Sequence, residues 1–110
     1  MKAIADSKVV GDPFAEETTN GAIVSDLQFN KVLNYIQSGR DQGATVVTGG
    51  ERVGQKGYFV RPTIFTNCRD DMKIAKEEIF GPVVSVFKFK DLNEALKRAN
   101  ATHYGLGNIF

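Results

Sequence analysis

The chain has 110 residues, of which 42% are hydrophobic and 25% are charged, a composition that is typical of one globular domain and excludes a disordered tail. Its 14 basic and 13 acidic residues nearly cancel and are dispersed along the chain. This balance excludes a strongly basic surface, so we expect neither nucleic acid nor an anionic membrane as a partner.

The first predicted helix covers residues 26–42 and begins at a capping box. Ser25 can cap its first turn, and Gln28 stands where a side chain can return the hydrogen bond. Apolar residues then recur at helical spacing, at positions 29, 32, 33 and 36. Gly43 is placed to end the helix in the left-handed conformation, and the β-branched run at 44–48 predicts a short strand.

The middle of the chain is predicted to contain two extended segments around a short helix. Residues 58–66 are rich in β-branched and aromatic side chains, and Pro62 within them favours a sheet edge or a crossover. A short helix is predicted over residues 70–78 and a strand over residues 83–89, with Gly81-Pro82 between them.

A second capping box begins the last predicted helix. Asp91 can cap its first turn and Glu94 can return the bond. Apolar residues follow at positions 92, 95, 96 and 99, and Gly105 falls shortly after the expected end of the helix. Helices and strands therefore alternate along the chain, which predicts an α/β fold.

Cysteine and histidine are scarce in this chain. Cys68 is the single cysteine and His103 the single histidine, which excludes an intramolecular disulfide, and we expect no metal site. The first 14 residues lack the apolar segment of a secretory signal, and no stretch approaches the ~20 apolar residues of a membrane span. We therefore expect a soluble protein of a reducing compartment, the cytoplasm.

Two adjacent acids, Glu77 and Glu78, stand directly before an apolar segment. At a helix end or in extended chain, neighbouring side chains cannot both face the same way. Two interpretations remain open. Both acids can be surface charges, or one can accept hydrogen bonds from two ligand hydroxyls, with Phe80 as an apolar wall and Gly81-Pro82 allowing close approach. Spacing alone does not choose between them.

Four strings occur in an uninterrupted order and carry a family resemblance. They are VGDPF at 10–14, LQFNKVLNYIQSGRDQGATVVTGGERVGQKGYFVRPTIF at 27–65, KEEIFGPV at 76–83 and RANATHYGL at 98–106. They resemble the aldehyde dehydrogenase superfamily, whose members oxidise aldehydes to carboxylic acids with NAD or NADP. The resemblance implies that residues 1–110 are a partial catalytic domain of α/β class, and that the Rossmann-like cofactor domain is absent from them.

The resemblance also implies which residues bind the cofactor. Glu78 matches the acid that hydrogen-bonds the hydroxyls of the nicotinamide ribose, and Phe80 matches the aromatic residue that packs near the same group. A carboxylate suits this role because its two oxygens can accept from both hydroxyls of the sugar. Gln28 and Lys31 match residues that reach towards the ribose and diphosphate, although Gln28 can equally complete the capping box.

The catalytic groups of the family have no counterpart in the chain. The family needs a thiol nucleophile in a GQxC context, an acidic general base and an asparagine that helps to form the oxyanion hole. Cys68, in TNCRDD, lacks that context and any visible means of lowering its pKa, and His103 is not a candidate base. We therefore predict no catalytic residue here and no aldehyde oxidation by the chain alone.

Two functions follow from this resemblance. In the first, the chain is part of an NAD(P)-dependent aldehyde dehydrogenase, contributes the nicotinamide-ribose side of the cofactor site, acts on a small aldehyde and is a homo-oligomer when complete. In the second, it is a truncated, inactive relative that serves as a binding or assembly module, or a nonfunctional remnant.

Two stretches depart from the family pattern. Residues 20–22 read Asn-Gly-Ala where the family usually has Gly-Pro, which loosens one turn without altering the fold. Residues 107–110 read GNIF where the family continues with small alanines into a strand. This divergence indicates a truncated or frame-altered end, which would leave strand edges and apolar faces uncovered.

Overall fold

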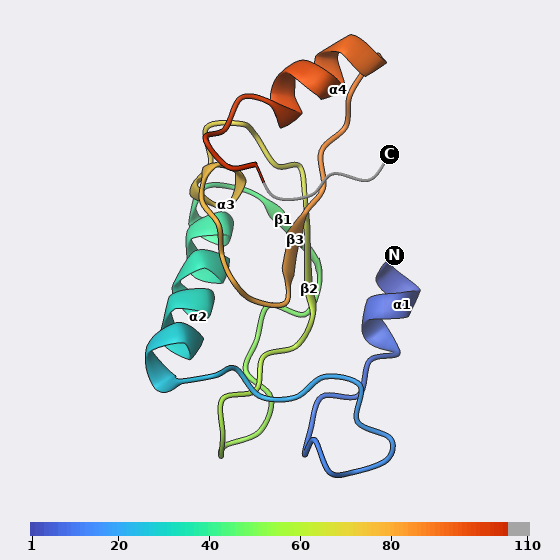
Figure 1. Cartoon of the computed structure of the whole chain (residues 1–110), viewed down its shortest axis with the longest axis vertical. Helices are drawn as coiled ribbons and strands as arrows, with labels where there is room; N and C mark the ends of the chain where they lie inside the picture. Colours follow the sequence, from blue (N-terminus) through green and yellow to red (C-terminus); the bar gives the residue numbers. More distant parts are fainter. Residues whose placement is uncertain (106–110) are drawn as a thin grey trace.

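A computed structural model describes residues 1–105, and Figure 1 shows how their helices and strands are arranged. A three-stranded sheet lies at the centre, with α2 along one side, α1 along the other and α4 beyond one end. The elements in chain order are α1 (Lys2–Asp6), α2 (Asp26–Asp41), β1 (Thr45–Thr48), β2 (Thr63–Thr66), α3 (Lys73–Lys76), β3 (Val83–Ser85) and α4 (Leu92–Ala99). The α/β class is confirmed, whereas the features predicted at Leu106 and at residues 107–110 lie outside the described residues.

The longest helix, α2, forms where the sequence predicted it. Ser25 caps its first turn, because Ser25 Oγ accepts a hydrogen bond from the backbone N–H of Gln28 at 3.2 Å. Gly43 adopts φ +91° directly after the helix, as expected for a left-handed terminus. Of the predicted apolar positions, Phe29, Val32 and Ile36 are buried in the core and Leu33 is partly buried. Tyr35, which the pattern did not include, is buried with them.

The helix α2 approaches the sheet closely at Gly39. A methyl group at this position would lie 3.0 Å from Ile74 Cδ1 and 3.0 Å from two ring carbons of Phe65. Both neighbours are buried, so there is little room for them to move. This close packing requires glycine at position 39, although glycine has a low helix propensity.

The sheet has the order β1, β2, β3. β1 and β2 are antiparallel, as is usual for neighbouring strands joined by a connection that turns back. β2 and β3 are parallel, with Thr63 opposite Val83, so the chain must cross over between them. The crossover contains α3, which packs on α2.

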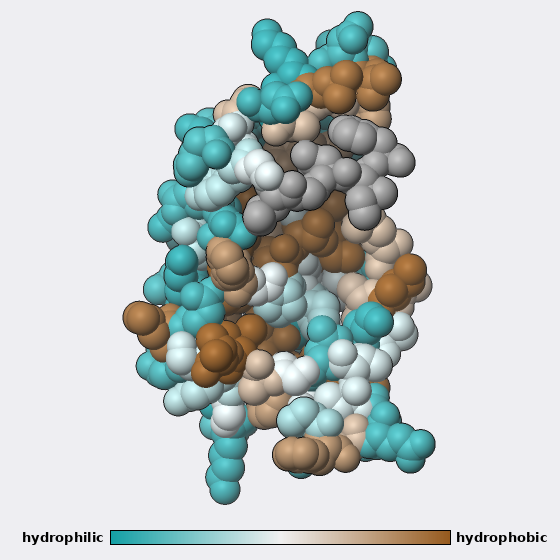
Figure 2. All heavy atoms as spheres, viewed as in Figure 1, coloured by the Kyte–Doolittle hydropathy of each residue, from teal (hydrophilic) through white to brown (hydrophobic). Residues whose placement is uncertain are grey.

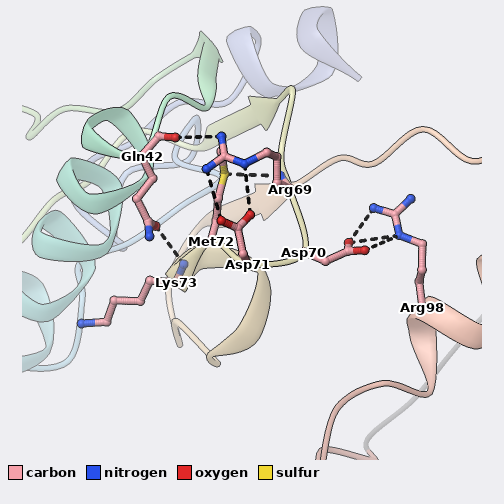
Figure 3. A network of polar contacts seen from close by, with 7 residues as sticks. All are labelled: Gln42, Arg69, Asp70, Asp71, Met72, Lys73 and Arg98. Carbon is pink, nitrogen blue, oxygen red and sulfur yellow. Dashed lines mark hydrogen bonds and ion pairs between the residues drawn. The ribbon is translucent and has the colours of Figure 1, made fainter.

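The predicted helix over residues 70–78 is wrong in extent, since α3 covers only Lys73–Lys76. Before it, Arg69 holds a turn by hydrogen bonds from Nε to Asp71 Oδ1 at 3.0 Å and from Nη1 to the carbonyl of Gln42 at 3.1 Å, which Figure 3 shows. After it, Glu77 is already extended, with φ −116° and ψ 147°. The tertiary contacts on either side therefore override the local helical pattern.

The two predicted strands are also shorter than expected. In residues 58–66, the part before Pro62 is extended but pairs with a preceding loop, where Val60 bridges Arg52, and only Thr63–Thr66 join the sheet. β3 ends at Ser85 instead of continuing to residue 89. Its neighbour β2 ends at the same level of the sheet, because Asn67 turns the chain with φ +55°. Residues after Ser85 therefore have no partner strand in β2.

The last helix, α4, forms where predicted and begins at Asp91, whose Oδ1 accepts a hydrogen bond from the Glu94 N–H at 2.9 Å. Arg98 of α4 forms an ion pair with Asp70, which Figure 3 shows. Arg98 donates to both carboxylate oxygens of Asp70, with 2.6 Å from Nη2 to Oδ1. Its Nη1 also donates to the carbonyl of Lys88 at 2.7 Å, so one side chain fixes the angle of the helix.

Large apolar side chains remain exposed over several parts of the surface. Figure 2 shows separate hydrophobic patches on the face that Figure 1 presents. Val84 lies on β3, which is an edge strand of the described sheet, and its exposed fraction is 40%. Phe14 and Phe89 are also exposed. Such patches are typical of surfaces that pack against further protein.

Candidate functional site

The segment of residues 77–82 runs past α2 and is held there by Gln28. Gln28 Nε2 donates to the carbonyl oxygens of Ile79 at 3.0 Å and of Phe80 at 2.9 Å. The two donors of this amide are therefore occupied by the segment. Within residues 1–105 its oxygen accepts no hydrogen bond from the Ser25 N–H, so the side chain does not complete the capping box. The structure brings Gln28 to the predicted site, but as a support for its backbone.

Gly81 brings the same segment into close contact with α2. A methyl group at Gly81 would lie 2.5 Å from Cγ2 and 3.0 Å from Cγ1 of Val32, which is fully buried. No larger residue fits unless the backbone or the helix moves. The close approach expected of Gly81-Pro82 is thus present, and its partner is the helix.

Phe80 combines an unusual backbone with an exposed ring. Its φ is +56°, in the left-handed region that side chains other than glycine rarely adopt, and its exposed fraction is 69%. A strained backbone of this kind costs on the order of 1–3 kcal/mol and tends to occur at functional sites. The ring is exposed within residues 1–105, so its burial there does not offset that cost.

Glu78 lies between the points at which the segment contacts α2 and is half-buried. Its backbone N–H donates to the Tyr104 hydroxyl over a long distance of 3.4 Å. Within residues 1–105, no side chain or backbone donor bonds its carboxylate. The two oxygens of Glu78 are therefore free to accept hydrogen bonds from another molecule.

Glu77 has a different environment, which the sequence did not reveal. Its Oε2 accepts a hydrogen bond of 2.6 Å from the hydroxyl of Tyr35, a residue of α2 with an exposed fraction of 6%. This bond and burial of the ring raise the pKa of Tyr35 to about 12. Lys73 Nζ lies 4.8 Å from the centre of the same ring. Glu77 is therefore tied to the core through its carboxylate.

Lys31 lies on α2 with its ammonium exposed, 5.9 Å from the centre of the Tyr35 ring. In the described part of the chain it forms no ion pair. It is thus near the Tyr35 and Glu77 pair but does not contact Glu78 or Phe80 by a hydrogen bond. Of the four predicted site residues, the structure joins Gln28 directly to the segment of Glu78 and Phe80 and leaves Lys31 apart.

The single cysteine is not part of this arrangement. Cys68 is half-buried next to the end of β2, and burial raises the pKa of its thiol. A raised pKa disfavours the reactive thiolate. His103 stacks on Tyr104, with 4.1 Å between ring centres.

Two further features concern the described residues as a whole, namely the side chains that a metal site requires and the helix that a membrane span requires. No group of three or more metal-ligating side chains gathers anywhere in residues 1–105. No helix in the same residues has the length and apolarity needed to cross a membrane.

Comparison with known proteins identifies the family. A model of the aldehyde dehydrogenase family matches residues 1–110. The aldehyde dehydrogenase of Davidiella tassiana is 58% identical over 96% of this chain, and benzaldehyde dehydrogenase of Antirrhinum majus is 52% identical over 96%. The chain covers 21% and 20% of these two relatives, so it spans about a fifth of their length.

Solved structures give the same result for the fold. Aldehyde dehydrogenase from Bacillus cereus, described in a complex with NAD+, is 51% identical and superposes with a TM-score of 0.92 over 94% of this chain and 21% of its own. The NAD+ complex of the Mycobacterium tuberculosis enzyme is 35% identical, with a TM-score of 0.90. The fold and its neighbours define the class, that of α/β proteins with the fold of this part of the aldehyde dehydrogenases. The chain belongs to the aldehyde dehydrogenase family.

Proposed function

We propose that this chain is part of the catalytic domain of an NAD(P)-dependent aldehyde dehydrogenase and supplies one wall of its nicotinamide-ribose site. The observation that carries the proposal is the half-buried residue Glu78, whose carboxylate accepts no hydrogen bond within residues 1–105, beside the exposed Phe80. The relatives with NAD+ in their structures support the choice of ligand. The complete protein would oxidise a small aldehyde to a carboxylic acid.

The chemistry of the ribose fits this carboxylate. The sugar presents two neighbouring hydroxyl groups, and the two oxygens of Glu78 can accept one hydrogen bond from each. Because the acceptor is charged, each bond contributes roughly 1.5–3 kcal/mol. The cofactor, when bound, accepts a hydride from the substrate, and Glu78 limits the motion of the ring that receives it.

The other predicted residues have separate roles in this proposal. Phe80 offers an apolar face against the ribose and nicotinamide. Gln28 acts through the backbone, since its amide donors hold the carbonyls of Ile79 and Phe80. Lys31 keeps an exposed positive charge on α2, which suits the diphosphate side of the cofactor.

The chain alone lacks a group for the chemical step. Its single cysteine has a raised pKa, and no second cysteine occurs in the sequence. This observation also favours the second candidate, an inactive relative that acts as a binding or assembly module. For the complete enzyme we propose a homo-oligomer of the cytoplasm. The two candidates differ in one respect, which is whether Glu78 contributes to turnover.

A chimeric enzyme tests the proposal, in which this chain replaces its matched segment in the Bacillus cereus aldehyde dehydrogenase. Glu78→Gln keeps the shape of the side chain but replaces one acceptor with a donor. We expect weaker NAD+ binding, lower kcat and a larger kinetic isotope effect with deuterated aldehyde, because a loosely held nicotinamide spends less time in the reacting geometry.

Glu77→Gln is the matched control for this experiment. Its amide still offers an oxygen to the Tyr35 hydroxyl, so turnover should change far less than with Glu78→Gln. Equal effects, or a larger loss at Glu77, would mean that the ribose has been assigned to the wrong acid.

A further inference from the structure

We propose that Tyr35 and Glu77 form a positioning pair that sets the direction of Glu78 and Phe80. This inference rests on the proposed function of Glu78 and concerns residues that do not touch the cofactor. Tyr35 is therefore a positioning residue, and it acts on the site through the backbone of Glu77. The argument depends on where α2 contacts the segment on each side of Glu78.

Two kinds of contact bracket Glu78 along the chain. Before it, the Tyr35 hydroxyl donates to Glu77 Oε2 at 2.6 Å. After it, Gln28 Nε2 donates to the carbonyls of Ile79 and Phe80 at 3.0 and 2.9 Å. All the donors come from one rigid helix, α2. Without the Tyr35 bond, side chains of α2 would form hydrogen bonds with residues 77–82 only on the side that follows Glu78.

The Tyr35 bond is well suited to holding a fixed position. The ring is buried in the same core cluster as Phe29, Val32 and Ile36, which restricts its motion. The acceptor is a carboxylate, which makes the bond shorter and stronger than one between neutral groups. An exposed glutamate normally samples many rotamers, and here its end is anchored to the core.

The backbone carries this constraint to Glu78. Glu77 is extended, with φ −116° and ψ 147°, and neighbouring side chains of an extended chain point to opposite sides. With the Glu77 carboxylate directed to α2, the Glu78 carboxylate is directed away from it. Phe80 lies just beyond and keeps its left-handed φ of +56° only while the surrounding contacts hold the backbone.

Tyr35→Phe in the chimeric enzyme removes the bond with little other change. The ring stays in the core, and Glu77 is an exposed residue, so water can replace the lost donor at its carboxylate. Glu77→Ala removes the acceptor instead. We expect each variant to raise the Kd for NAD+ by about threefold to tenfold and to lower kcat, measured well below the melting temperature of each variant.

The double variant and two controls separate positioning from stability. The double variant, Tyr35→Phe with Glu77→Ala, should raise the Kd for NAD+ no more than the single variant with the larger effect does, because both substitutions remove the same hydrogen bond. Glu77→Gln should restore a Kd within about twofold of the parent, since it keeps an acceptor. Tyr58→Phe also removes a phenolic hydroxyl, one that forms no hydrogen bond within residues 1–105, and should leave the Kd unchanged.

Two results would overturn the positioning role alone. One is a Kd for NAD+ that stays at the parent value in Tyr35→Phe while the melting temperature falls, which would make the bond merely structural. The other is a double variant whose effects multiply. If Glu78→Gln itself leaves NAD+ binding unchanged, then the proposed function of Glu78 fails, and the positioning role fails with it.

Discussion

Gly81→Ala in the chimeric enzyme should loosen the whole segment from α2. The added methyl group would stand 2.5 Å from Cγ2 of Val32 and 3.0 Å from Cγ1. Carbon atoms in contact lie about 3.5–4.0 Å apart, so the segment or the helix must move by about an ångström. Gly81 has no left-handed φ, and the whole penalty is therefore steric. Overpacking of this kind costs about 1–3 kcal/mol.

Hydrogen exchange in the native enzyme can measure this cost locally. The Thr63 N–H donates to the carbonyl of Pro82 at 2.8 Å, so its exchange reports on opening of the segment from β2. A loss of 1–3 kcal/mol should speed that exchange by about 5- to 150-fold. Gly21→Ala is the matched control, because a methyl group there would lie 4.0 Å from its nearest neighbour, Pro13 Cβ.

A second substitution tests whether Val32 is the cause. Val32→Ala removes both γ carbons from a fully buried position and should cost about 2 kcal/mol by itself. Combined with Gly81→Ala, it removes the clash, and the new methyl group occupies part of the space. The double variant should therefore lose at least about 1 kcal/mol less than the sum of the single losses. Additive losses would refute the steric explanation.

Two further predictions concern the contacts around this segment. Asp70→Asn should speed hydrogen exchange in α4 by about twofold to fivefold, because it weakens the hold of Arg98, whereas Asp71→Asn, which affects only the Arg69 turn, should leave α4 unchanged. In the second, the stability difference between the parent and Tyr35→Phe should be constant below the ordinary tyrosine pKa of 10.0 and shrink as the pH rises towards the raised pKa of about 12. Urea midpoints across this pH range measure that difference, and a difference that grows with pH would contradict the assigned cause, a bond that favours the protonated hydroxyl. Lys31 and Lys73 lie over the Tyr35 ring, and Tyr104 also raises the pKa of Tyr35, so both proteins must be compared at each pH.

The sequence predicted the elements whose signals are local. α2 and α4 both combine a capping residue with apolar residues at helical spacing. α2 ends one residue before its predicted bound, and α4 begins directly after the predicted cap, Asp91. The ends of α3 and β3 were wrong because other parts of the chain decide them. α3 stops where the segment turns to meet Gln28, and β3 stops where its partner strand ends.

The sequence likewise predicted only part of the candidate site. The string KEEIFGPV predicted Glu78 and Phe80 as cofactor-binding residues, and this stays a prediction. The alternation of side chains correctly indicated that Glu77 and Glu78 have different surroundings. The bond from Tyr35 to Glu77 could not be found, because Tyr35 lies on the buried face of α2 and looks like an ordinary core residue in the sequence. Gln28 had two possible roles, and the structure gives it a third, as a donor to two backbone carbonyls.

Residues outside the string KEEIFGPV help to orient the side chains within it. Glu78 has no bonding partner for its carboxylate within residues 1–105, and Phe80 has a strained backbone, so neither residue fixes its own position. Their positions come from Gln28, Val32 and Tyr35, which lie on successive turns of one helix face. The string and the helix thus form one unit. A change on that face of α2 can therefore alter the proposed ribose site without contacting the cofactor.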